Sequence, residues 1–450
     1  MKNWLTATLF ISILASLDLA ADFSLTDPAA ALEEWDQETL TVILAGGTVY
    51  NGDEKKGRIA DVGILDHHIM AIGNLSKHKA KIRLDVSGLA VTPGFIDIHS
   101  HAVRKKREES GIFLWPDAEN YIRQGVTTVI GGPDGFSEYP VSVLFADLED
   151  APASVNFGTF VGHNTVRELA MGRENRAPTV QELRFMKDMV KIAMVDGAFG
   201  LSSGLKYVPG AYSKTEEVIA LARVAGLNGG IYITHMREEG LGLIDSVAET
   251  IRIGEKAGLP AQITHHKAMG MKMWGKSSEM LEMVNAANAR GLDITLDQYP
   301  YSASSAVNHG MSEEDVVRIM QYPKTMIASD GGIFMSGDNV PHPRNYGSFA
   351  RVLGVYVREK GVLSFPVAVH KMSRMPADRI GLQDRGRIEV GAIADITVLD
   401  PDRVIDRATY QNPHQFSEGV QHVFVNGQAV LLNGKMTGER PGRVLRSNRD

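Results

Sequence analysis

Histidines with the spacing of metal ligands close several apolar segments of the chain. His99 and His101 end the segment GFIDIHSH, and residues two apart on a strand share one face, so both imidazoles can reach one ion. His235 closes GIYITH, His265 follows AQIT, and the carboxylate of Asp330 closes TMIASD. This set predicts a metal site at successive strand ends. Because the sequence contains no cysteine, the donors must be nitrogen and oxygen.

The segments that carry these residues alternate with helix-like stretches. Eight strand-like segments are GFIDIH, VTTVIGG, VNFGTFVG, AFGLSSGL, GIYITH, AQITHH, DITLDQY and TMIASD. Stretches between them, such as TVQELRFMKDMVKIAMVDG and GLIDSVAETIRIGEKAG, are apolar on one face and end at a glycine. Eight such units over residues 92–376 predict an α/β fold, a (β/α)8 TIM-type barrel whose active site lies at the carboxyl ends of its strands.

Both ends of the chain predict a second, smaller domain. Residues 40–91 contain TVILAGGTVYNG and ADVGILDHHIMAIG, and residues 377–445 contain GRIEVGAIADITVLD and VQHVFVNGQAVLLNGKM. All four show alternating apolar residues with Gly or Asn at the turns, which is typical of short strands. The few strands at one end cannot enclose a core alone. We therefore expect one β-sandwich built from both termini, with the barrel inserted within it.

Charge and the N-terminal segment bear on partners and compartment. With a net charge of -7, the chain has no basic field that would attract nucleic acid or an anionic membrane. Residues 1–21 carry Lys2, an apolar run and small residues near a cleavage point, which predicts a signal peptide and export to the periplasm or the medium. The run is too short for a comfortable membrane span. The alternative is a disordered or helical start to a cytoplasmic enzyme.

The ordered motifs resemble the amidohydrolase superfamily and, more narrowly, the D-aminoacylase (N-acyl-D-amino-acid deacylase) family. They include GGTVYNG, TPGFIDIHSH, GLSSGLKYVPGAYS, ITHHK, IASDGG and HPRNYG, and they cover nearly the whole chain after the signal segment. The resemblance implies a zinc-dependent hydrolase that cleaves the linear amide of an N-acyl-amino acid, of D configuration, to a carboxylic acid and a free amino acid.

The resemblance also implies roles for the predicted ligands. His99 and His101 would hold one metal position, His235 and His265 the other, and Asp330 would be the catalytic carboxylate. Neutral imidazoles can hold one or two Zn²⁺ ions, with cobalt or manganese as alternatives, and zinc lowers the pKa of its bound water to about 7. Asp330 would take the proton of the attacking water and deliver it to the departing amine.

One turn departs from the family pattern. The family has a cysteine ligand in a GNCG-like turn after the second barrel strand, whereas this chain reads Gly131-Gly132-Pro133-Asp134-Gly135. Asp134 could replace the thiolate as an oxygen donor. Lys206, in GLKYVPG, could instead bridge two metals as a carbamate, as in many amidohydrolases. A turn-forming Asp-Gly and a substrate-facing cation are the alternative interpretations of the two residues.

Cations after the histidines predict a site for a substrate carboxylate. By the period of two, Arg237 faces the same way as His235, and Lys267 the same way as His265. The resemblance adds contacts within DQYPY and HPRNYG. The predicted substrate-binding residues are Arg237, Lys267, Tyr299 and Arg344. Such a cluster suits an N-acyl amino acid better than a neutral amide, because arginine can bind a carboxylate through two hydrogen bonds. Salt bridges with neighbouring acidic residues are the alternative.

The segment between the seventh and eighth strands is short. Family members carry a long insertion there that forms a flap, whereas residues 300–324 here contain one predicted helix, SEEDVVRIMQYP. Without a flap the entrance to the active site would be more open, so two other functions are considered. One is a related hydrolase acting on dipeptides or on cyclic amides, as dihydroorotases and hydantoinases do. The other is a binding protein that has lost catalysis.

Overall fold

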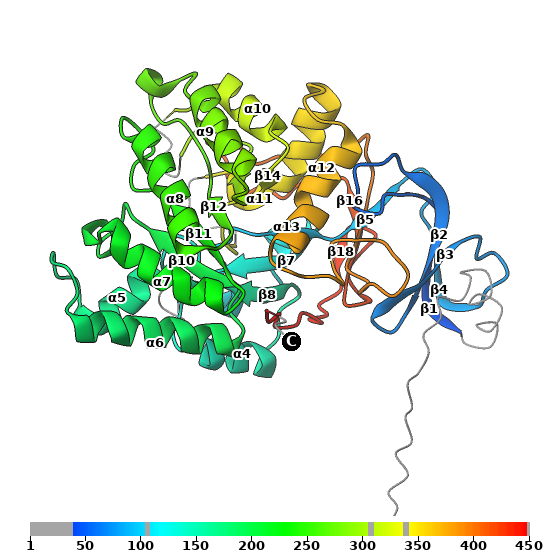
Figure 1. Ribbon diagram of the computed structural model, residues 1–450. Helices are drawn as coiled ribbons and strands as arrows, with labels where there is room; N and C mark the ends of the chain where they lie inside the picture. The colour runs from blue at the N-terminus through cyan, green and yellow to red at the C-terminus, as the bar shows by residue number, and fades with distance from the viewer. Residues whose placement is uncertain (1–38, 104–108, 305–309, 336–341, 448–450) are drawn as a thin grey trace, which may run out of the picture. The chain divides into compact units, whose positions relative to one another are not determined.

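The computed structural model describes residues 39–103, 109–304, 310–335 and 342–447. From Thr39 onward the chain forms one compact unit (Figure 1). The predicted signal peptide, residues 1–21, lies outside the described residues and stays a prediction. None of the described helices is both long enough and apolar enough to cross a membrane.

All eight predicted barrel segments form parallel strands, arranged in two sheets. A three-stranded sheet has the order β6-β7-β8, and a six-stranded sheet has the order β14-β13-β12-β11-β10-β9. Their bounds are β6 Phe95–Asp97, β7 Val126–Gly131, β8 Asn156–Thr159, β9 Val161–Gly162, β10 Gly200–Gly204, β11 Ile231–His235, β12 Ala261–Ile263, β13 Ile294–Gln298 and β14 Thr325–Ile327. β8 and β9 come from one predicted segment, VNFGTFVG, which Phe160 interrupts.

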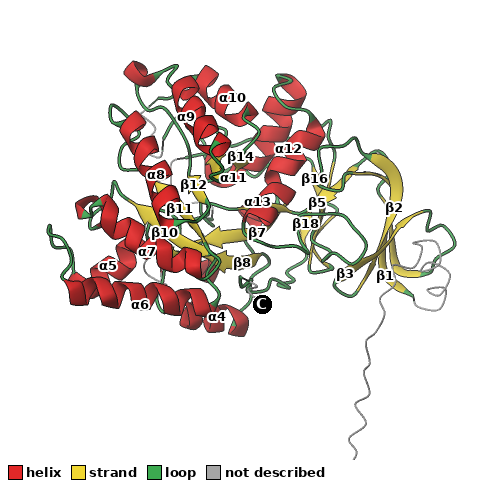
Figure 2. Cartoon of the chain, viewed as in Figure 1, coloured by secondary structure: helices red, strands yellow, loops and turns green. Residues whose placement is uncertain are grey.

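Helices follow most of these strands along the chain (Figure 2). Their bounds are α2 Gly111–Leu114, α3 Glu119–Ile122, α4 Val141–Asp150, α5 His163–Met171, α6 Val180–Asp196, α7 Thr215–Leu227, α8 Leu243–Ala257, α9 Ser277–Ala289, α10 Glu313–Gln321, α11 Arg344–Arg351, α12 Phe365–Met372 and α13 Arg374–Arg379. Short 3-10 helices cover Gly210–Tyr212 (η2) and Met271–Met273 (η3), and a π-helix covers Val352–Glu359 (η4).

Local signals in the sequence explain where these helices begin and end. Thr179 and Glu182 form a reciprocal capping box at the start of α6, and Gly197 ends that helix in the left-handed conformation. Ser312 caps α10, the helix predicted between the last two barrel strands. Every residue of β10, β11 and β13 is buried, as expected for strands covered on both faces. The predicted alternation of strands and helices is therefore confirmed.

Strands from both ends of the chain form a single nine-stranded sheet. Its path is β18-β17-β16-β15-β5-β1-β2-β3, and β4 pairs with β1. The bounds are β1 Leu40–Val49, β2 Arg58–Leu65, β3 His68–Gly73, β4 Ala80–Asp85, β5 Ala90–Pro93, β15 Ile396–Leu399, β16 Val420–Val425, β17 Gln428–Leu432 and β18 Lys435–Met436. The antiparallel pair β5–β15 joins the two ends. The predicted sandwich of two sheets is not confirmed, and the predicted domain bounds stay a prediction.

Candidate active site

The predicted ligands follow the carboxyl ends of the parallel strands. β11 ends on His235, and His265 follows the end of β12 by two residues. His99 stands two residues beyond β6, and its carbonyl accepts a 3.1 Å hydrogen bond from the backbone N–H of Asp330, which follows β14. A parallel bridge between Ser100 and Gly331 lies beside this hydrogen bond. Side chains that are far apart in sequence therefore meet at one end of the parallel strands.

Two groups of side chains could each hold a metal ion, and they share one residue. The first group is His99, His101, Asp134 and Asp330; the second is Asp134, His235 and His265. Within each group the nearest ligand atoms all lie within 4.8 Å of one another. The predicted metal ligands are thus brought together, with the exception of Lys206.

The Asp134 carboxylate contacts all four imidazoles. Its Oδ1 lies 3.5 Å from Nε2 of His99 and 3.4 Å from Nε2 of His265. Its Oδ2 lies 3.6 Å from Nε2 of His101 and 3.7 Å from Nδ1 of His235. Burial alone would raise the pKa of Asp134, but the neighbouring histidines hold this pKa well below its usual range. Asp134 is therefore an anionic oxygen donor placed between the two groups.

Several ligand atoms of this cluster are buried without a hydrogen-bond partner among the described residues. Those that face one another are Nε2 of His99, Nε2 of His265 and Oδ1 of Asp134, and Nδ1 of His99 and Nε2 of His235 are also without a partner. Buried polar atoms in folded proteins are nearly always satisfied, so three unsatisfied atoms that face one another point to a bound group. Imidazole nitrogens and carboxylate oxygens are donors for zinc and similar divalent ions. The residues present thus fit the metal that the resemblance implies.

Three side chains of the cluster stand on strained backbone. Asp134, His265 and Asp330 have φ angles of 56°, 33° and 50°, in the left-handed region that residues other than glycine rarely adopt. Hydrogen bonds hold these turns: Gly135 N–H donates to Ser202 Oγ at 3.2 Å, and His265 N–H donates to Asp297 Oδ1 at 2.8 Å. The surrounding structure thus imposes conformations that aim these side chains into the site.

Asp330 forms an ion pair with Arg344. The guanidinium donates to Oδ2 of Asp330 at 2.5 Å, and Oδ1 lies 3.1 Å from Nε2 of His101. Burial would raise the pKa of Asp330, but Arg344 and the histidines hold this pKa well below its usual range. Asp330 is therefore ionised at neutral pH.

Lys267 and Tyr299 lie beside the same site. Lys267 Nζ donates to Glu239 Oε1 at 2.6 Å and to the carbonyl of His265 at 2.8 Å. The Tyr299 ring lies between two cations, with Lys267 Nζ 5.5 Å and the guanidinium carbon of Arg344 5.2 Å from its centroid. The Tyr299 hydroxyl is buried and has no partner among the described residues. Three of the four predicted substrate contacts therefore gather at one place.

Arg237 is not brought to that place. Its guanidinium donates two hydrogen bonds to Glu249, at 3.0 and 2.9 Å, and it also donates to the carbonyls of Ala211 and Ser213. The alternation argument is wrong for this residue because β11 ends at His235, so the chain no longer has the period of a strand at Arg237. The salt-bridge alternative describes its environment.

We expect Arg237→Gln to change stability and to leave substrate affinity alone. Loss of the partly buried pair with Glu249 should lower the free energy of unfolding by about 1–2 kcal/mol, measured by urea denaturation. The KM for the substrate should stay at the wild-type value, because the side chain is engaged away from Asp330 and Arg344. A large rise in KM with an unchanged free energy of unfolding would show that Arg237 binds the substrate.

Lys206 also lies outside both groups that the described residues form. Its Nζ is 3.5 Å from Oε1 of Glu238, and its side chain is 38% exposed. The partner is a carboxylate and the environment is partly solvated, so the lysine is placed as a cation at the rim. In this arrangement Asp134, and not Lys206, occupies the position between the two groups.

Two more residues lie at the site: Tyr207, which the sequence did not single out, and Glu239, which it offered only as a possible salt-bridge partner of the cations. The Tyr207 hydroxyl lies 3.3 Å from Nδ1 of His235, and the two rings are 4.6 Å apart. Glu239 lies against His235, His265 and Lys267. Tyr207 belongs to the quoted motif GLKYVPG, so the motif itself could have identified it. The expected salt bridge is present between Glu239 and Lys267, but no local signal predicted contact between Glu239 and the two imidazoles.

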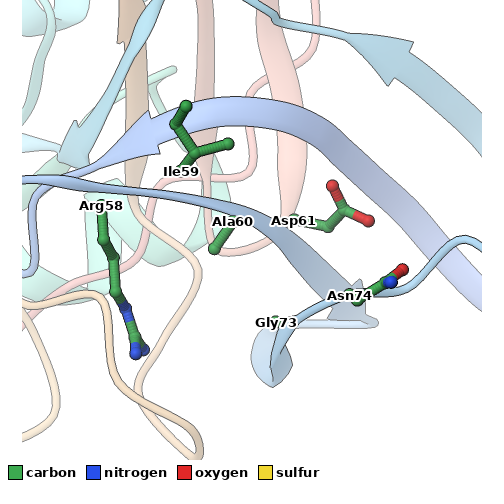
Figure 3. Close-up of a pocket in the computed structure, with 6 residues that line it drawn as sticks. All are labelled: Arg58, Ile59, Ala60, Asp61, Gly73 and Asn74. Atoms are coloured by element: carbon green, nitrogen blue, oxygen red, sulfur yellow. The ribbon is translucent and has the colours of Figure 1, made fainter.

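A hollow in the nine-stranded sheet contains none of these residues. It is lined by residues of β2, by the last residue of β3 and by the residue that follows it: Arg58, Ile59, Ala60, Asp61, Gly73 and Asn74 (Figure 3). The carboxylate of Asp61 is occupied there by the backbone N–H groups of Gly46 and Leu75. The hollow therefore has no part in the chemistry of the histidine cluster.

Comparison with known proteins agrees with this geometry. The model of the amidohydrolase family matches residues 184–431. A D-aminoacylase from Alcaligenes xylosoxydans xylosoxydans is 37% identical over 489 residues, a match that spans 92% of this chain and 99% of the relative. The chain belongs to the amidohydrolase family. The resemblance seen in the motifs is thereby confirmed.

Solved structures of amidohydrolases superpose on most of the chain. The crystal structure of a D-aminoacylase has a TM-score of 0.83 at 35% identity and covers 90% of this chain and 100% of its own. An N-acyl-D-glutamate deacylase from Bordetella bronchiseptica has a TM-score of 0.84 at 33% identity and covers 91% of this chain and 100% of its own. The latter was solved with zinc and a phosphonate inhibitor that mimics the tetrahedral intermediate of its reaction. The amidohydrolase fold is therefore shared along nearly the whole chain.

Proposed function

We propose that this amidohydrolase hydrolyses N-acyl-D-amino acids to a carboxylic acid and a free D-amino acid. The observation that carries the proposal is the ionised Asp330, paired with Arg344 and placed against a histidine cluster with unsatisfied ligand atoms. The relatives named D-aminoacylase and N-acyl-D-glutamate deacylase support this substrate class. A proton acceptor, a metal site and a carboxylate-binding cation are the three parts that such a hydrolysis needs.

Asp134 and the histidines would hold the metal. His99, His101 and Asp330 would contribute to one position and His235 and His265 to the other, and Asp134 belongs to both groups. When bound there, a divalent cation would supply Lewis-acid chemistry, which polarises a carbonyl oxygen and lowers the pKa of a bound water molecule. The strained turns keep the ligands in place before any ion arrives, which reduces the cost of ordering them.

Asp330 moves the proton. Its carboxylate takes the proton of the attacking water as the oxygen forms a bond to the amide carbon, and it delivers that proton to the amide nitrogen as the C–N bond breaks. Arg344 holds the carboxylate in its ionised form and fixes its orientation. Without this transfer the amine would be a poor leaving group.

Arg344, Lys267 and Tyr299 would bind the free carboxylate of the substrate. Both cations flank the Tyr299 ring, and the buried Tyr299 hydroxyl is free to donate a hydrogen bond. A carboxylate placed there would lie beside Asp330, so the adjacent amide would be presented to the metal cluster. This arrangement favours an α-acylamino acid over an amide that carries no charge.

A substrate panel tests the proposal. We expect zinc-loaded protein to release free amine from N-acetyl-D-methionine at least about tenfold faster than from N-acetyl-L-methionine, since tenfold corresponds to only 1.4 kcal/mol of differential transition-state binding. Dihydrouracil should not be opened. Hydrolysis of dihydrouracil alone would assign the chain to cyclic amides. Metal-loaded protein that binds N-acetyl-D-methionine without releasing amine would make it a binding protein.

We also infer that the two parallel sheets belong to one closed barrel. The Ser100–Gly331 bridge and the hydrogen bond from Asp330 to His99 support contact between the ends of β6 and β14. Likewise, β8 and β9 continue one chain segment across Phe160, whose N–H donates to the carbonyl of Gly131 on β7. We expect a crystal structure to show continuous backbone hydrogen bonding between β6 and β14 and from β7 across the β8–β9 segment to β10. Absence of this hydrogen bonding at either place would overturn the inference.

A further inference from the structure

Glu239 has a buried carboxylate that the proposed mechanism does not use. It lies four residues beyond His235, the end of β11, and it is 3% exposed. Its backbone is held on both sides: the N–H donates to Oε1 of Glu238 at 3.0 Å, and the carbonyl accepts from the N–H of Met269 at 2.8 Å. The side chain therefore has a fixed position between the loops that follow β11 and β12.

Each oxygen of Glu239 faces a different imidazole. Oε1 lies 3.0 Å from Nδ1 of His265, and Oε2 lies 3.6 Å from Nε2 of His235. In both rings this is the nitrogen remote from Asp134, because Asp134 faces Nε2 of His265 and Nδ1 of His235. The two carboxylates thus stand on opposite sides of the same pair of rings.

The position of the proton on each imidazole explains why a carboxylate is needed on this side of the rings. A neutral imidazole has one N–H, so a ring that uses one nitrogen as a ligand must carry its proton on the other nitrogen and needs an acceptor there. Lys267 Nζ lies 2.7 Å from Nδ1 of His265, but an ammonium group has no acceptor atom. Oε1 of Glu239 is within reach of a proton on Nδ1 of His265, whereas Oε2, at 3.6 Å, is the nearest carboxylate oxygen to Nε2 of His235, which has no hydrogen-bond partner among the described residues.

We propose that Glu239 is the positioning residue of the second metal position. Its carboxylate accepts the Nδ1 proton of His265 and is placed to draw in the Nε2 proton of His235, so that the nitrogens facing Asp134 are free to bind the ion. It also balances the charge of Lys267, with which it forms a 2.6 Å ion pair. The inference rests on the metal site of the proposed function, and its test does not depend on turnover.

The test measures metal binding to metal-free protein. Zn²⁺ is titrated by calorimetry, the bound metal is counted by mass spectrometry, and Co²⁺ absorption reports the ligand geometry. Because Glu239→Gln alone leaves the Lys267 ammonium buried without a carboxylate, the decisive variant is the double substitution Glu239→Gln with Lys267→Met. Lys267→Met alone is its reference, and Glu238→Gln on the neighbouring residue is the matched control. Thermal melting of the metal-free variants checks that each is folded.

We expect Glu238→Gln to bind two equivalents as the wild type does, and Lys267→Met is the reference against which the double variant is compared. The double variant should bind the second equivalent about 10–100-fold more weakly, with an altered Co²⁺ spectrum, while the first equivalent is unchanged. Equal affinity for the second equivalent in Lys267→Met and in the double variant would overturn the proposal, as would wild-type protein that binds only one equivalent. Absence of amine release from fully loaded wild type would defeat the proposed function and leave this inference standing.

Discussion

Asp330→Asn lowers kcat by about 10²–10⁴-fold and leaves the metal content at the wild-type level: this is the outcome we expect from the geometry of the carboxylate. Asparagine keeps an oxygen that can accept the hydrogen bond of Arg344, so the local structure is retained. The asparagine side chain cannot take the proton of the attacking water. The leaving amine then receives no proton from residue 330 and departs more slowly. The measurement combines steady-state amine release with metal analysis of the same sample.

A carboxylate outside the site provides the control for this substitution. Asp245 lies in the first turn of α8 and is exposed, so Asp245→Asn should leave kcat unchanged. If Asp330→Asn retained its metal and turned over at nearly the normal rate, Asp330 would have no place in the mechanism. If Asp330→Asn lost its metal together with its activity, Asp330 would act mainly as a metal ligand, which agrees with its place in the first metal group.

The second large effect is expected at the residue that both metal groups share. Asp134→Ala should weaken binding at both positions by at least about 100-fold, the upper end of what the loss of an outer-sphere partner costs, because one carboxylate contacts all four imidazoles. Activity should fall with metal occupancy. Titration of metal-free protein with Zn²⁺ measures both affinities.

Lys206→Gln is the matched comparison for Asp134. The Lys206 ammonium faces Glu238 at the partly exposed rim, so its replacement should leave both zinc affinities at the wild-type value. The reverse pattern, in which Lys206→Gln loses a metal and Asp134→Ala keeps both, would identify a lysine carbamate as the bridge. The two variants together therefore decide which residue joins the metal positions.

The order of ligands along the chain was determined by the sequence itself. Each histidine of the site follows an apolar segment of strand length, and β6, β11 and β12 appear at those segments. Helix limits were equally local, as the capping box at Thr179 and the terminal Gly197 of α6 illustrate. Such features depend on neighbours within a few residues along the chain, so the local sequence is enough to predict them.

Orientation beyond the strand ends was decided only by the tertiary structure. After His235 the chain leaves β11, and Arg237 turns to Glu249, a residue of α8 that no periodicity connects to it. Lys206 likewise turns to Glu238 on another loop. Loop side chains have no fixed period, so their partners depend on which loops the packed strands bring together.

The same limit applies to Glu239 and to the nine-stranded sheet. Glu239 acquires its two imidazole neighbours because β11 and β12 are adjacent, and that adjacency exists only in the folded chain. Alternating segments at the two termini predicted strands correctly, but the pairing of β5 with β15, which joins them in one hydrogen-bonded sheet, could not be predicted from either segment alone. A local pattern specifies which residues are buried, whereas pairing depends on contacts between segments about 300 residues apart.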